Sequence, residues 1–551
     1  MKNNVDFSDV RELSLLLARF ASVTGTAGEK EFAPFLIELL SGMPWFGTHP
    51  DGLRLLPIPG DPNGRSNVAA FVRGSGSRCL VLTGHYDVVE TTGYGPLESL
   101  AFEPEALAAR ILETVPEDGA DPVSARLRAD IASGKFLPGR GILDMKSGIA
   151  AGIATLFRFA KFGEKIGNML LLAVADEEGG SCGMRAASPA LRDYLAELGC
   201  EPSAVFNLDS AVDQGAGEAG RVIFLGSVGK ILPFVLFIGK SAHAGAPFDG
   251  INPALLAAEF VRSVESNPEA LGEKPQASGE SPPPPPVLLY MRETRSSYDV
   301  TTPKSVFCAM NALSHERGPD EVLACTAGLA AAAMDKSLSI LRERASEQSR
   351  RGSERFSPPD RQPVTMDFAE LVARAEAMVP GILEAARIKA DDARAVDPVA
   401  AACAVVSALA AIAIPEGPCA VVGFAPPYYP CARLDKLRDT VFLATLRRET
   451  ARFAVDTGTQ VRLRQYFPGI SDMSFMAASD GPGLADFVDA RSPLRSASAP
   501  PALGCPVINV GPWGRDYHQA GERVHVRYSF VELPELLWRL AMGVLEPCGE
   551  A

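Results

Sequence analysis

Histidine is scarce in this chain, with six residues among 551, and the ten cysteines never form a C-x-x-C pair. A thiolate-based zinc site uses such closely spaced cysteines, so this class of site is not expected. Several cysteines lie within apolar runs, which indicates small buried side chains in a reduced compartment. A metal site in this protein must therefore rely on histidine and carboxylate ligands.

Long apolar runs are also lacking. The longest, residues 399–414, lies between Pro398 and Pro415. It is shorter than the ~20 residues that cross a membrane, and its many alanines predict a buried helix. Since no positively charged start precedes an apolar core, we expect a cytoplasmic protein. The net charge of -14 argues against a general nucleic-acid binder, and we expect neither nucleic-acid nor membrane partners.

The chain is longer than one hydrophobic core usually allows, so we expect two domains. Continuous apolar runs at residues 79–83, 168–175 and 204–208 predict buried strands, and helical patterns alternate with them. This alternation is typical of an α/β fold. We predict a three-layer α/β/α catalytic domain with a mostly parallel sheet.

A second domain is predicted within the first, because the pattern changes after Arg221 to the order β-α-β-β-α-β. This order is typical of a small α+β (ferredoxin-like) domain with four strands and two helices. We therefore divide the chain into a first catalytic part at 1–221, an inserted lid and dimerisation domain at 222–367, and a second catalytic part at 368–551. A polar stretch at 345–361 is expected to be disordered.

Five fragments place histidine, aspartate or glutamate after strand-like runs. They read GHYD (84–87), ILDMK (142–146), ADEEGG (175–180), NLDS (207–210) and RDYHQ (515–519). The carboxyl ends of parallel strands meet at one sheet edge, where ligand crevices form. Seven side chains are then expected to converge: His85, Asp87, Asp144, Glu177, Glu178, Asp209 and His518.

Five carboxylates and two imidazoles in one crevice form a poor structural core, because unpaired buried charges are costly. Divalent cations resolve this conflict, and mixed histidine and carboxylate ligation suits Zn²⁺, Mn²⁺ or Co²⁺. One carboxylate can bridge two ions about 3.5–4 Å apart. Each fragment alone has a plainer interpretation as a surface pair, a solvated turn or a helix cap. Their joint occurrence favours the metal interpretation.

Together the five fragments resemble the two-metal peptidase and deacylase family of acetylornithine deacetylase, succinyl-diaminopimelate desuccinylase, aminoacylase-1 and carboxypeptidase G. The segment GKSAHAGAPFDGINPA (239–254) is similar to the lid segment of that family. The resemblance runs from about Leu13 to Leu545. It implies two divalent ions, first of all Zn²⁺. Asp144 bridges both ions in that family pattern, with one completed by Glu178 and His518 and the other by His85 and Asp209.

The same resemblance implies roles for four further residues. Glu177 is the expected general base, and Asp87 is expected to accept the proton on the far nitrogen of His85. His243 is expected to stabilise the oxyanion in the active site of a partner subunit, through a homodimer formed by the lid. Its alternative is a lid-surface histidine without a role. Asn252 is expected to assist substrate binding.

The sequence thus predicts a di-metal hydrolase of amide bonds in short peptides or N-acyl amino acids, acting through a metal-bridging hydroxide. The segments 93–107, 423–430 and 466–475 depart from compact members and resemble the arginine-utilisation branch of bacterial arginine breakdown. They are expected to wall a pocket, where Asp472 either meets a cationic group or caps a helix. Two alternatives remain: a related aminopeptidase family without the lid, and a catalytically silent binding or regulatory relative.

Overall fold

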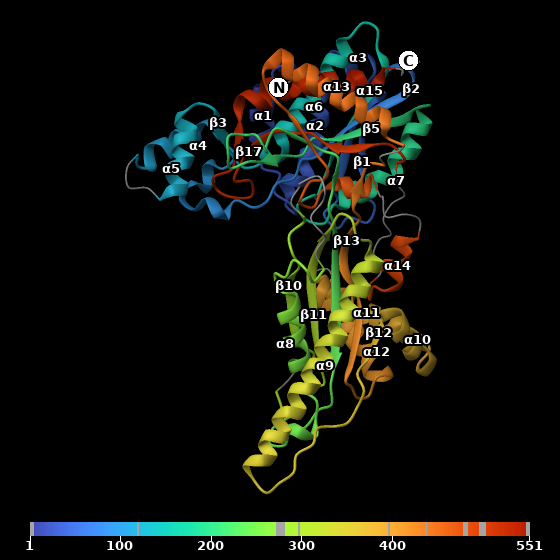
Figure 1. Cartoon of the computed structure of the whole chain (residues 1–551). Coiled ribbons are helices and arrows are strands. Elements are labelled where there is room, and N and C mark those ends of the chain that lie inside the picture. Colours follow the sequence, from blue (N-terminus) through green and yellow to red (C-terminus); the bar gives the residue numbers. More distant parts are fainter. Residues whose placement is uncertain are drawn as a thin grey trace. The chain divides into compact units, whose positions relative to one another are not determined.

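The computed structural model describes residues 5–117, 121–271, 282–295, 298–394, 397–435, 438–477, 483–494 and 503–546 (Figure 1). The chain divides into two compact units. Unit 1 comprises Met1–Ser227, Ala432–Ser479 and Pro500–Ala551, and unit 2 comprises Val228–Cys431 and Asp480–Ala499.

The main sheet of unit 1 has seven strands in the order β1-β2-β5-β16-β7-β15, with β4 also paired to β2. Strands β2, β4, β5 and β16 run parallel to their neighbours among this group, so their carboxyl ends share one edge. The strands are β1 (Leu53–Pro57), β2 (Ser66–His85), β4 (Ile166–Val174), β5 (Glu201–Asn207), β7 (Val222–Phe224), β15 (Arg462–Arg464) and β16 (Val507–Asn509).

Strand β2 passes along β4 twice. Val72 and Leu80 both lie opposite Met169. Along the first half of β2, the paired residues of β4 decrease in number. Along the second half they increase, and this half ends with His85 opposite Val174. The strand predicted at 79–83 is therefore part of a longer continuous element, and β4 lies between its two halves.

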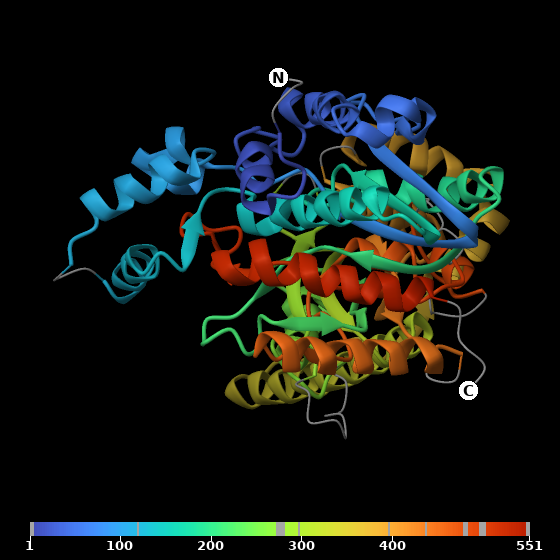
Figure 2. The same ribbon diagram turned by 90° about the horizontal axis from the view of Figure 1, so that it is seen from above.

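Helices cover both faces of this sheet, which gives the three layers predicted from the sequence (Figure 2). Leu171 and Ala173 belong to the core shared with α6 and α15, whereas the alternate residues Leu170 and Leu172 face away from it. Helix α7 packs against β2, β4 and β5 on that second side. The helices are α1 (Val10–Ala18), α2 (Ala27–Ser41), α6 (Ser147–Lys161), α7 (Cys182–Glu197), α13 (Thr440–Thr457) and α15 (Leu533–Leu545).

A second sheet in unit 1 has the order β3-β18-β17-β6. Its strands are β3 (Phe136–Pro138), β6 (Ala211–Val212), β17 (Trp513–Arg515) and β18 (Arg523–His525). The segment before β3 forms a short 3-10 region, η2 (Thr92–Leu100), and two helices, α4 (Pro104–Thr114) and α5 (Pro122–Ala132). In both views these helices project from the side of unit 1 where β17 lies (Figures 1 and 2).

Unit 2 is built on a five-stranded sheet in the order β10-β11-β9-β13-β12. Alternate residues of β9 enter two separate cores, so both faces of the sheet are covered. Helices α8 and α9 pack on one face and α10 and α12 on the other (Figure 1). The elements are β9 (Gly229–Ile238), β10 (Val287–Glu293), β11 (Ser305–Ser314), β12 (Val364–Asp367), β13 (Cys419–Tyr429), α8 (Pro253–Val264), α9 (Pro319–Arg351), α10 (Phe368–Met378), α11 (Ile382–Arg394), α12 (Pro398–Ala413) and α14 (Leu484–Ala490).

Unit 2 is larger than the lid predicted from the sequence. The prediction assigned residues 368–431 to the catalytic domain, but β13 pairs with β9 and α12 packs on the same sheet. The second boundary therefore lies at Cys431, and the first at Ser227. The inserted α+β domain is present as predicted, but its sheet has five strands instead of four, and helices cover both faces. Helix α9 continues to Arg351, so the expected disorder does not begin at residue 345.

Within the described residues, no helix combines the length and the apolar character needed to cross a membrane. The nine cysteines of the described part of the chain are free thiols, and most are buried.

Candidate metal centre

Three candidate ligands follow strands of the main sheet. His85 is the last residue of β2, Asp209 lies two residues beyond β5, and Glu178 lies four residues beyond β4. Because these strand ends share one edge, the sheet brings the three side chains together as predicted. Tyr86 points elsewhere, since its ring stacks on Phe32 and its hydroxyl donates to a backbone carbonyl.

Asp144 and His518 reach the site from different elements, which corrects the expectation that every fragment ends a strand of the main sheet. Asp144 lies in a short turn, Ile142–Lys146, that leads into α6. His518 lies in the turn that joins β17 to β18 of the small sheet. The apolar run before His518 is β16 of the main sheet, but the chain continues through β17 before it reaches His518. The apolar pattern before Asp144 belongs to β3 and to the turn itself.

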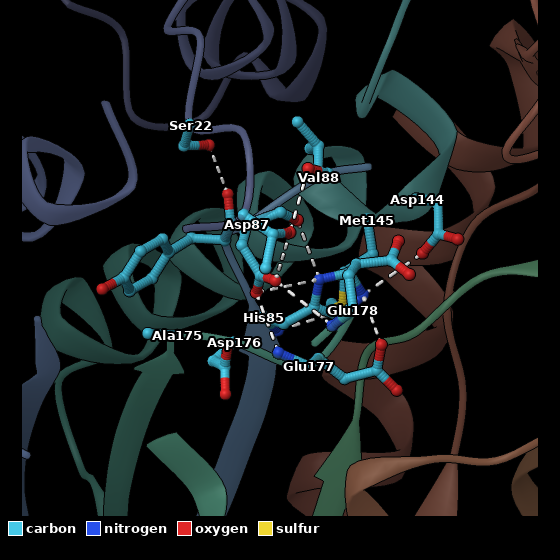
Figure 3. A network of polar contacts seen from close by, with 12 residues as sticks. Ser22, His85, Asp87, Val88, Asp144, Met145, Ala175, Asp176, Glu177 and Glu178 are labelled. Carbon is cyan, nitrogen blue, oxygen red and sulfur yellow. Dashed lines mark hydrogen bonds and ion pairs between the residues drawn. The ribbon is translucent and has the colours of Figure 1, made fainter. Parts of the chain in front are cut away.

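The two carboxylate oxygens of Asp144 face two different imidazoles. Asp144 Oδ1 lies 3.2 Å from His85 Nε2, and Asp144 Oδ2 lies 3.1 Å from His518 Nε2. Asp209 Oδ1 lies 3.7 Å from His85 Nε2, and Glu178 Oε1 lies 2.9 Å from His518 Nε2. Asp144 is thus shared between two groups of side chains, one around each histidine. Figure 3 shows Asp144 beside His85 and Glu178.

These groups have the composition and spacing of metal sites. Among the described residues, three trios of candidate ligand atoms lie within 4.8 Å of one another: His85 with Asp144 and Asp209; Asp144 with Glu178 and His518; and His85 with Glu177 and Glu178. None contains a thiolate, so the donors suit Zn²⁺, Co²⁺ or Mn²⁺. The side chains present therefore fit two divalent ions that share Asp144.

The electrostatics of the cluster also fit bound cations. Burial raises the pKa of Glu177 well above its usual range, with Asp209, Asp472 and Glu178 adding to the effect. Burial likewise raises the pKa values of Glu178 and Asp209. Without cations the charged forms of these carboxylates are therefore disfavoured, and bound cations remove this conflict.

The two histidines show the complementary effect. Burial opposes their charged forms, but hydrogen bonds to carboxylates outweigh it and raise the pKa of His518 to about 10 and that of His85 well above its usual range. Burial also opposes ionisation of Asp144, yet the hydrogen bonds from His518 and His85 lower the pKa of Asp144. Protons on the imidazoles thus occupy the positions where ligand lone pairs would face an ion.

Asp87 has a different partner from the one predicted. His85 Nδ1 lies 3.0 Å from the backbone carbonyl oxygen of Asp87, but 3.7 Å from its carboxylate. A carbonyl oxygen only accepts, so this contact places the proton on Nδ1 and turns Nε2 toward the cluster. The Asp87 carboxylate instead accepts the backbone N–H of Glu177 at 3.1 Å, that of Glu178 at 3.2 Å and the hydroxyl of Thr24 at 3.0 Å. It holds the turn that carries Glu177 and Glu178 (Figure 3).

A buried arginine holds the same turn from its other side, and the sequence analysis missed it. Arg65 pairs with Asp176 at 2.6 Å, with Asp61 at 2.8 Å and with Glu29 at 3.0 Å. Asp176 has a left-handed backbone with φ of 66° and accepts the backbone N–H of Cys182. The only signal in the sequence is a charged residue directly before a strand, which is too common to single out.

Glu522 is a second missed residue, although it lies within the motif around His518. Its carboxylate accepts from Arg140 and from the backbone N–H groups of Leu143 at 3.2 Å and Asp144 at 3.3 Å. Its own carbonyl accepts from the backbone of Gly139 at 3.1 Å. Burial raises the pKa of Glu522 to about 7, against the effect of Arg140. Glu522 therefore links the Asp144 turn to the segment that follows His518.

Two predicted site residues, His243 and Asn252, belong to unit 2. The ring of His243 is exposed, and its Nδ1 accepts the backbone N–H of Gly245 at 3.0 Å. Asn252 caps helix α8, because its side-chain oxygen accepts the backbone N–H of Ala254 at 2.9 Å. The catalytic role of His243 and the substrate-binding role of Asn252 stay predictions.

Asp472 does not cap a helix, which was one of its two predicted roles. The cap of the short turn Asp472–Phe475 is Ser471, whose hydroxyl accepts the backbone N–H of Met473. The Asp472 side chain is buried, and neither of its oxygens has a hydrogen-bond partner among the described residues. Burial raises its pKa to about 7, and the charges of Asp87 and Asp209 add to this effect.

Comparison with known proteins settles the family. The profile described as Peptidase family M20/M25/M40 matches residues 112–488, which is more than half of the chain. The chain belongs to peptidase family M20/M25/M40. The resemblance found in the sequence is confirmed, and the protein is a hydrolase of amide or peptide bonds, as the members of this family are. The match leaves out His85 and His518, which the fold brings next to Asp144.

Two relatives cover almost the whole chain, and a third covers a smaller part. Uncharacterized protein YqjN of Bacillus subtilis is 32% identical over 533 residues, with 95% of this chain and 93% of the relative covered. Protein RocB of the same organism is 28% identical over 585 residues, with 98% and 97% covered. A succinyl-diaminopimelate desuccinylase of Roseobacter denitrificans is 33% identical over 125 residues, with 23% of this chain and 31% of the relative covered.

Proposed function

We propose that this M20 member is a two-metal hydrolase that cleaves an amide bond of a short peptide or an N-acylated amino acid. One observation carries the proposal: the two oxygens of Asp144 face His85 at 3.2 Å and His518 at 3.1 Å. A carboxylate held between two imidazoles in this way is the arrangement that a bridging ligand needs. Asp209 joins the His85 group and Glu178 joins the His518 group.

Zn²⁺ is the first candidate for both ions, with Co²⁺ and Mn²⁺ as alternatives, because the donors are imidazole and carboxylate only. When bound, the ions would polarise the scissile carbonyl and lower the pKa of a water molecule from ~15.7 toward ~7. The chain supports this by fixing its ligands: the proton on His85 Nδ1 is held by the Asp87 carbonyl, and the backbone of Asp144 is held by Glu522.

Glu177 is the proposed general base. Its carboxylate lies 4.0 Å from His85 Nε2 and accepts no hydrogen bond from any described residue. Its backbone N–H is fixed by the Asp87 carboxylate. Glu177 is thus held in place while its carboxylate stays available to take a proton from the attacking water and deliver it to the leaving nitrogen. A positioned carboxylate of raised pKa contributes ~10²–10⁴ in rate when it acts as such a base.

The substrate class follows from the relatives and from the sequence. The desuccinylase that resembles this chain acts, by its name, on an N-acylated amino acid. The resemblance to the arginine-utilisation branch makes acyl and peptide derivatives of arginine and ornithine the first candidates. A homodimer formed through unit 2, the oxyanion role of His243 and a cytoplasmic location belong to the same proposal.

The proposal is tested by metal analysis combined with turnover of acetyl-, succinyl- and dipeptide derivatives of arginine and ornithine. Purified protein is expected to hold two divalent ions per chain. Glu177→Gln keeps the shape of the side chain and removes the base, so kcat is expected to fall ~10²–10⁴-fold with unchanged metal content. Glu113→Gln is the matched control, since Glu113 is exposed and pairs only with Arg110.

Full activity of Glu177→Gln would remove Glu177 from the mechanism. Protein that takes up no metal at all would instead favour the catalytically silent alternative. Hydrolysis of peptides with a free amino terminus, without any turnover of N-acylated substrates, would favour an aminopeptidase. The presence of unit 2 disfavours the lidless family among aminopeptidases.

A further inference from the structure

The turn that carries His518 has an unusual backbone. Asp516 has a φ of 55° and His518 a φ of 61°, so two residues other than glycine lie in the left-handed region. Such residues cost about 1–3 kcal/mol each and persist only where their surroundings impose the conformation. The His518 side chain itself is 43% exposed, so packing around the ring does not hold it. The contacts that keep this backbone conformation must therefore be made by other residues of the turn.

A partly buried network of charges contacts this turn. The carboxylate of Asp516 accepts from Gln214 at 2.6 Å and from the fully buried guanidinium of Arg523. Arg523 Nε in turn donates to Asp130 at 2.8 Å. Asp130 also accepts from Arg515, which ends strand β17 just before the turn. Two arginines and two aspartates balance one another, and both ends of the turn are tied to Asp130.

Asp130 comes from a part of the chain that is remote in sequence. It lies in the last turn of α5, within residues 92–117 and 121–135, which we call the brace segment. This segment includes residues 93–107, which depart from compact members of the family. It has its own small apolar core, made of Tyr94, Ala101, Leu107, Ile111 and Ile131. Figure 1 shows α4 and α5 at the side of unit 1 where β17 is labelled, and the ion pair of Asp130 with Arg515 joins α5 to the end of β17.

Two further contacts tie the brace segment to the same turn. Ala520, two residues after His518, packs against the apolar core of the segment. Arg140 bonds Glu522, while its guanidinium lies 5.2 Å from the ring of Tyr94 and its backbone N–H donates to Ala101. Apolar contact, cation–π contact and ion pairs thus converge on the His518 turn from one inserted segment.

We propose that the brace segment positions His518 for its metal ion, and that Asp130 acts as a positioning residue through Arg515 and Arg523. The inference rests on the proposed two-metal function. Removing one member of a buried charge network leaves its partners uncompensated, so the loss of Asp130 loosens both ends of the turn. Because orienting contacts of this kind change metal affinity ~10–100-fold, the ion shared by Glu178 and His518 is the one affected.

The test uses the full chain, stripped of metal and titrated with Co²⁺, with calorimetry and visible absorption as readouts. Asp130→Asn is expected to bind one Co²⁺ as the wild type does and the second ~10–100-fold more weakly, with an altered visible spectrum. His518→Gln and Asp209→Asn, which each remove a ligand of one ion, identify which ion is lost. Asp121→Asn is the matched control: Asp121 caps the same helix α5, and within the described part of the chain its side chain bonds Val123 and Ser124.

If folded Asp130→Asn binds both ions with wild-type affinity, the proposal that the brace segment positions His518 is wrong. Wild-type protein without metal binding would overturn the proposed function instead, so the two failures are distinct. If circular dichroism shows that Asp130→Asn is unfolded, Arg515→Lys is measured in the same way. It keeps the charge and leaves the Arg523–Asp130 contact in place, and it removes the guanidinium contacts of Arg515 to the Asp130 carboxylate and to the carbonyl oxygens of Asp213 and Gly215. Selective loss of the second ion there supports the brace, and unchanged binding contradicts it.

Discussion

At the scale of single residues, Asp87 shows how a buried carboxylate can serve neighbours other than the obvious one. It is fully buried, two residues from His85, and yet its oxygens bind the backbone N–H groups of Glu177 and Glu178. The imidazole of His85 depends on the Asp87 carbonyl, which any residue at this position would supply. The carboxylate therefore matters first for the turn that carries the base and one metal ligand.

Asp87→Asn tests this assignment. The asparagine keeps one acceptor oxygen, so one of the two backbone contacts is lost. We expect the affinity for the ion held by Glu178 to fall ~10–100-fold and the affinity for the ion held by His85 to change much less. Calorimetric titration with Zn²⁺ measures both. Thr24→Val removes only the hydroxyl contact to Asp87 and is expected to have a smaller effect. An equal loss of affinity for both ions would indicate that the Asp87 carboxylate supports His85 after all.

Asp472 is a second residue whose charge is costly. Its folded-state pKa of about 7 lies above the usual 3.8, so its penalty to stability grows as pH rises above about 4 and is complete above about 7. Asp472→Asn removes the charge. We expect metal-free Asp472→Asn to be more stable than the wild type at pH 8, by up to about 4 kcal/mol, and to gain little at pH 4.5. Guanidinium unfolding at both pH values measures this.

Asp213→Asn is the comparison for Asp472. Asp213 accepts the backbone N–H groups of Gly215 at 2.6 Å and Ala219 at 3.1 Å, and these contacts lower its pKa despite partial burial. Its charge stabilises the fold at pH 8, so Asp213→Asn is expected to be less stable than the wild type there. A gain of stability in both variants, or in neither, would contradict the assignment of the Asp472 charge as unfavourable.

The sequence anticipated which side chains meet in the site but not what holds them. His85, Asp209 and Glu178 follow strands whose apolar runs are plain in the sequence, and parallel strands place their ends together. Arg65, Glu522 and Asp130 are charged residues in unremarkable contexts, and their partners lie up to 393 positions away. No local pattern encodes such pairs. The role of Asp87 was misjudged because nearness in sequence does not show which atoms of a residue make the contact.

At the scale of elements, the pattern of β13 and α12 was read correctly but their sheet was not. Apolar runs predict that a strand or helix is buried, and they do not say against which partner. Residues 368–551 were assigned to the catalytic domain, and that range includes β13. Strand β13 pairs instead with β9 and β12 in the sheet of unit 2. The second layer of helices in unit 2, α10 to α12, belongs to the same residues 368–431 that were assigned to the catalytic domain.

Leu409→Ala tests where α12 belongs. Leu409 is fully buried in the core formed with β9, so its truncation is expected to lower the free energy of unfolding of unit 2 by about 2–5 kcal/mol. Metal stoichiometry and affinity are expected to stay unchanged, because the candidate ligands all belong to unit 1. Leu289→Ala is the control on β10, where the side chain is 56% exposed and truncation is expected to matter by less than about 0.5 kcal/mol. Impaired metal binding in Leu409→Ala would support the original assignment of residues 368–431 to the catalytic domain.

At the scale of the whole molecule, the balance of charge in the centre determines how the metal-free protein responds to pH. Burial raises the pKa values of Glu177, Glu178 and Asp209, and it raises that of Glu29 to about 7. The folded protein then binds protons that the unfolded chain releases. The free energy of unfolding therefore falls as pH rises and these protons are lost. His518, with a pKa raised to about 10, contributes stability below about pH 6.5 that is also lost as pH rises.

Asp144 has a lowered pKa, so its contribution is present above about pH 4 and stays constant from pH 5.5 to 8. The metal-free protein is therefore expected to lose stability across this range, by about 3 kcal/mol for each additional proton that the folded state holds. Bound ions replace those protons, so the loaded protein is expected to show a weaker dependence. At a free metal concentration of 100 times Kd, each ion adds about 2.7 kcal/mol. Guanidinium unfolding of chelator-treated and Zn²⁺-loaded protein at pH 5.5 and 8 measures both effects. A metal-free protein that gained stability toward pH 8 would show that the clustered carboxylates are not in conflict, and the physical reason for placing cations among them would be lost.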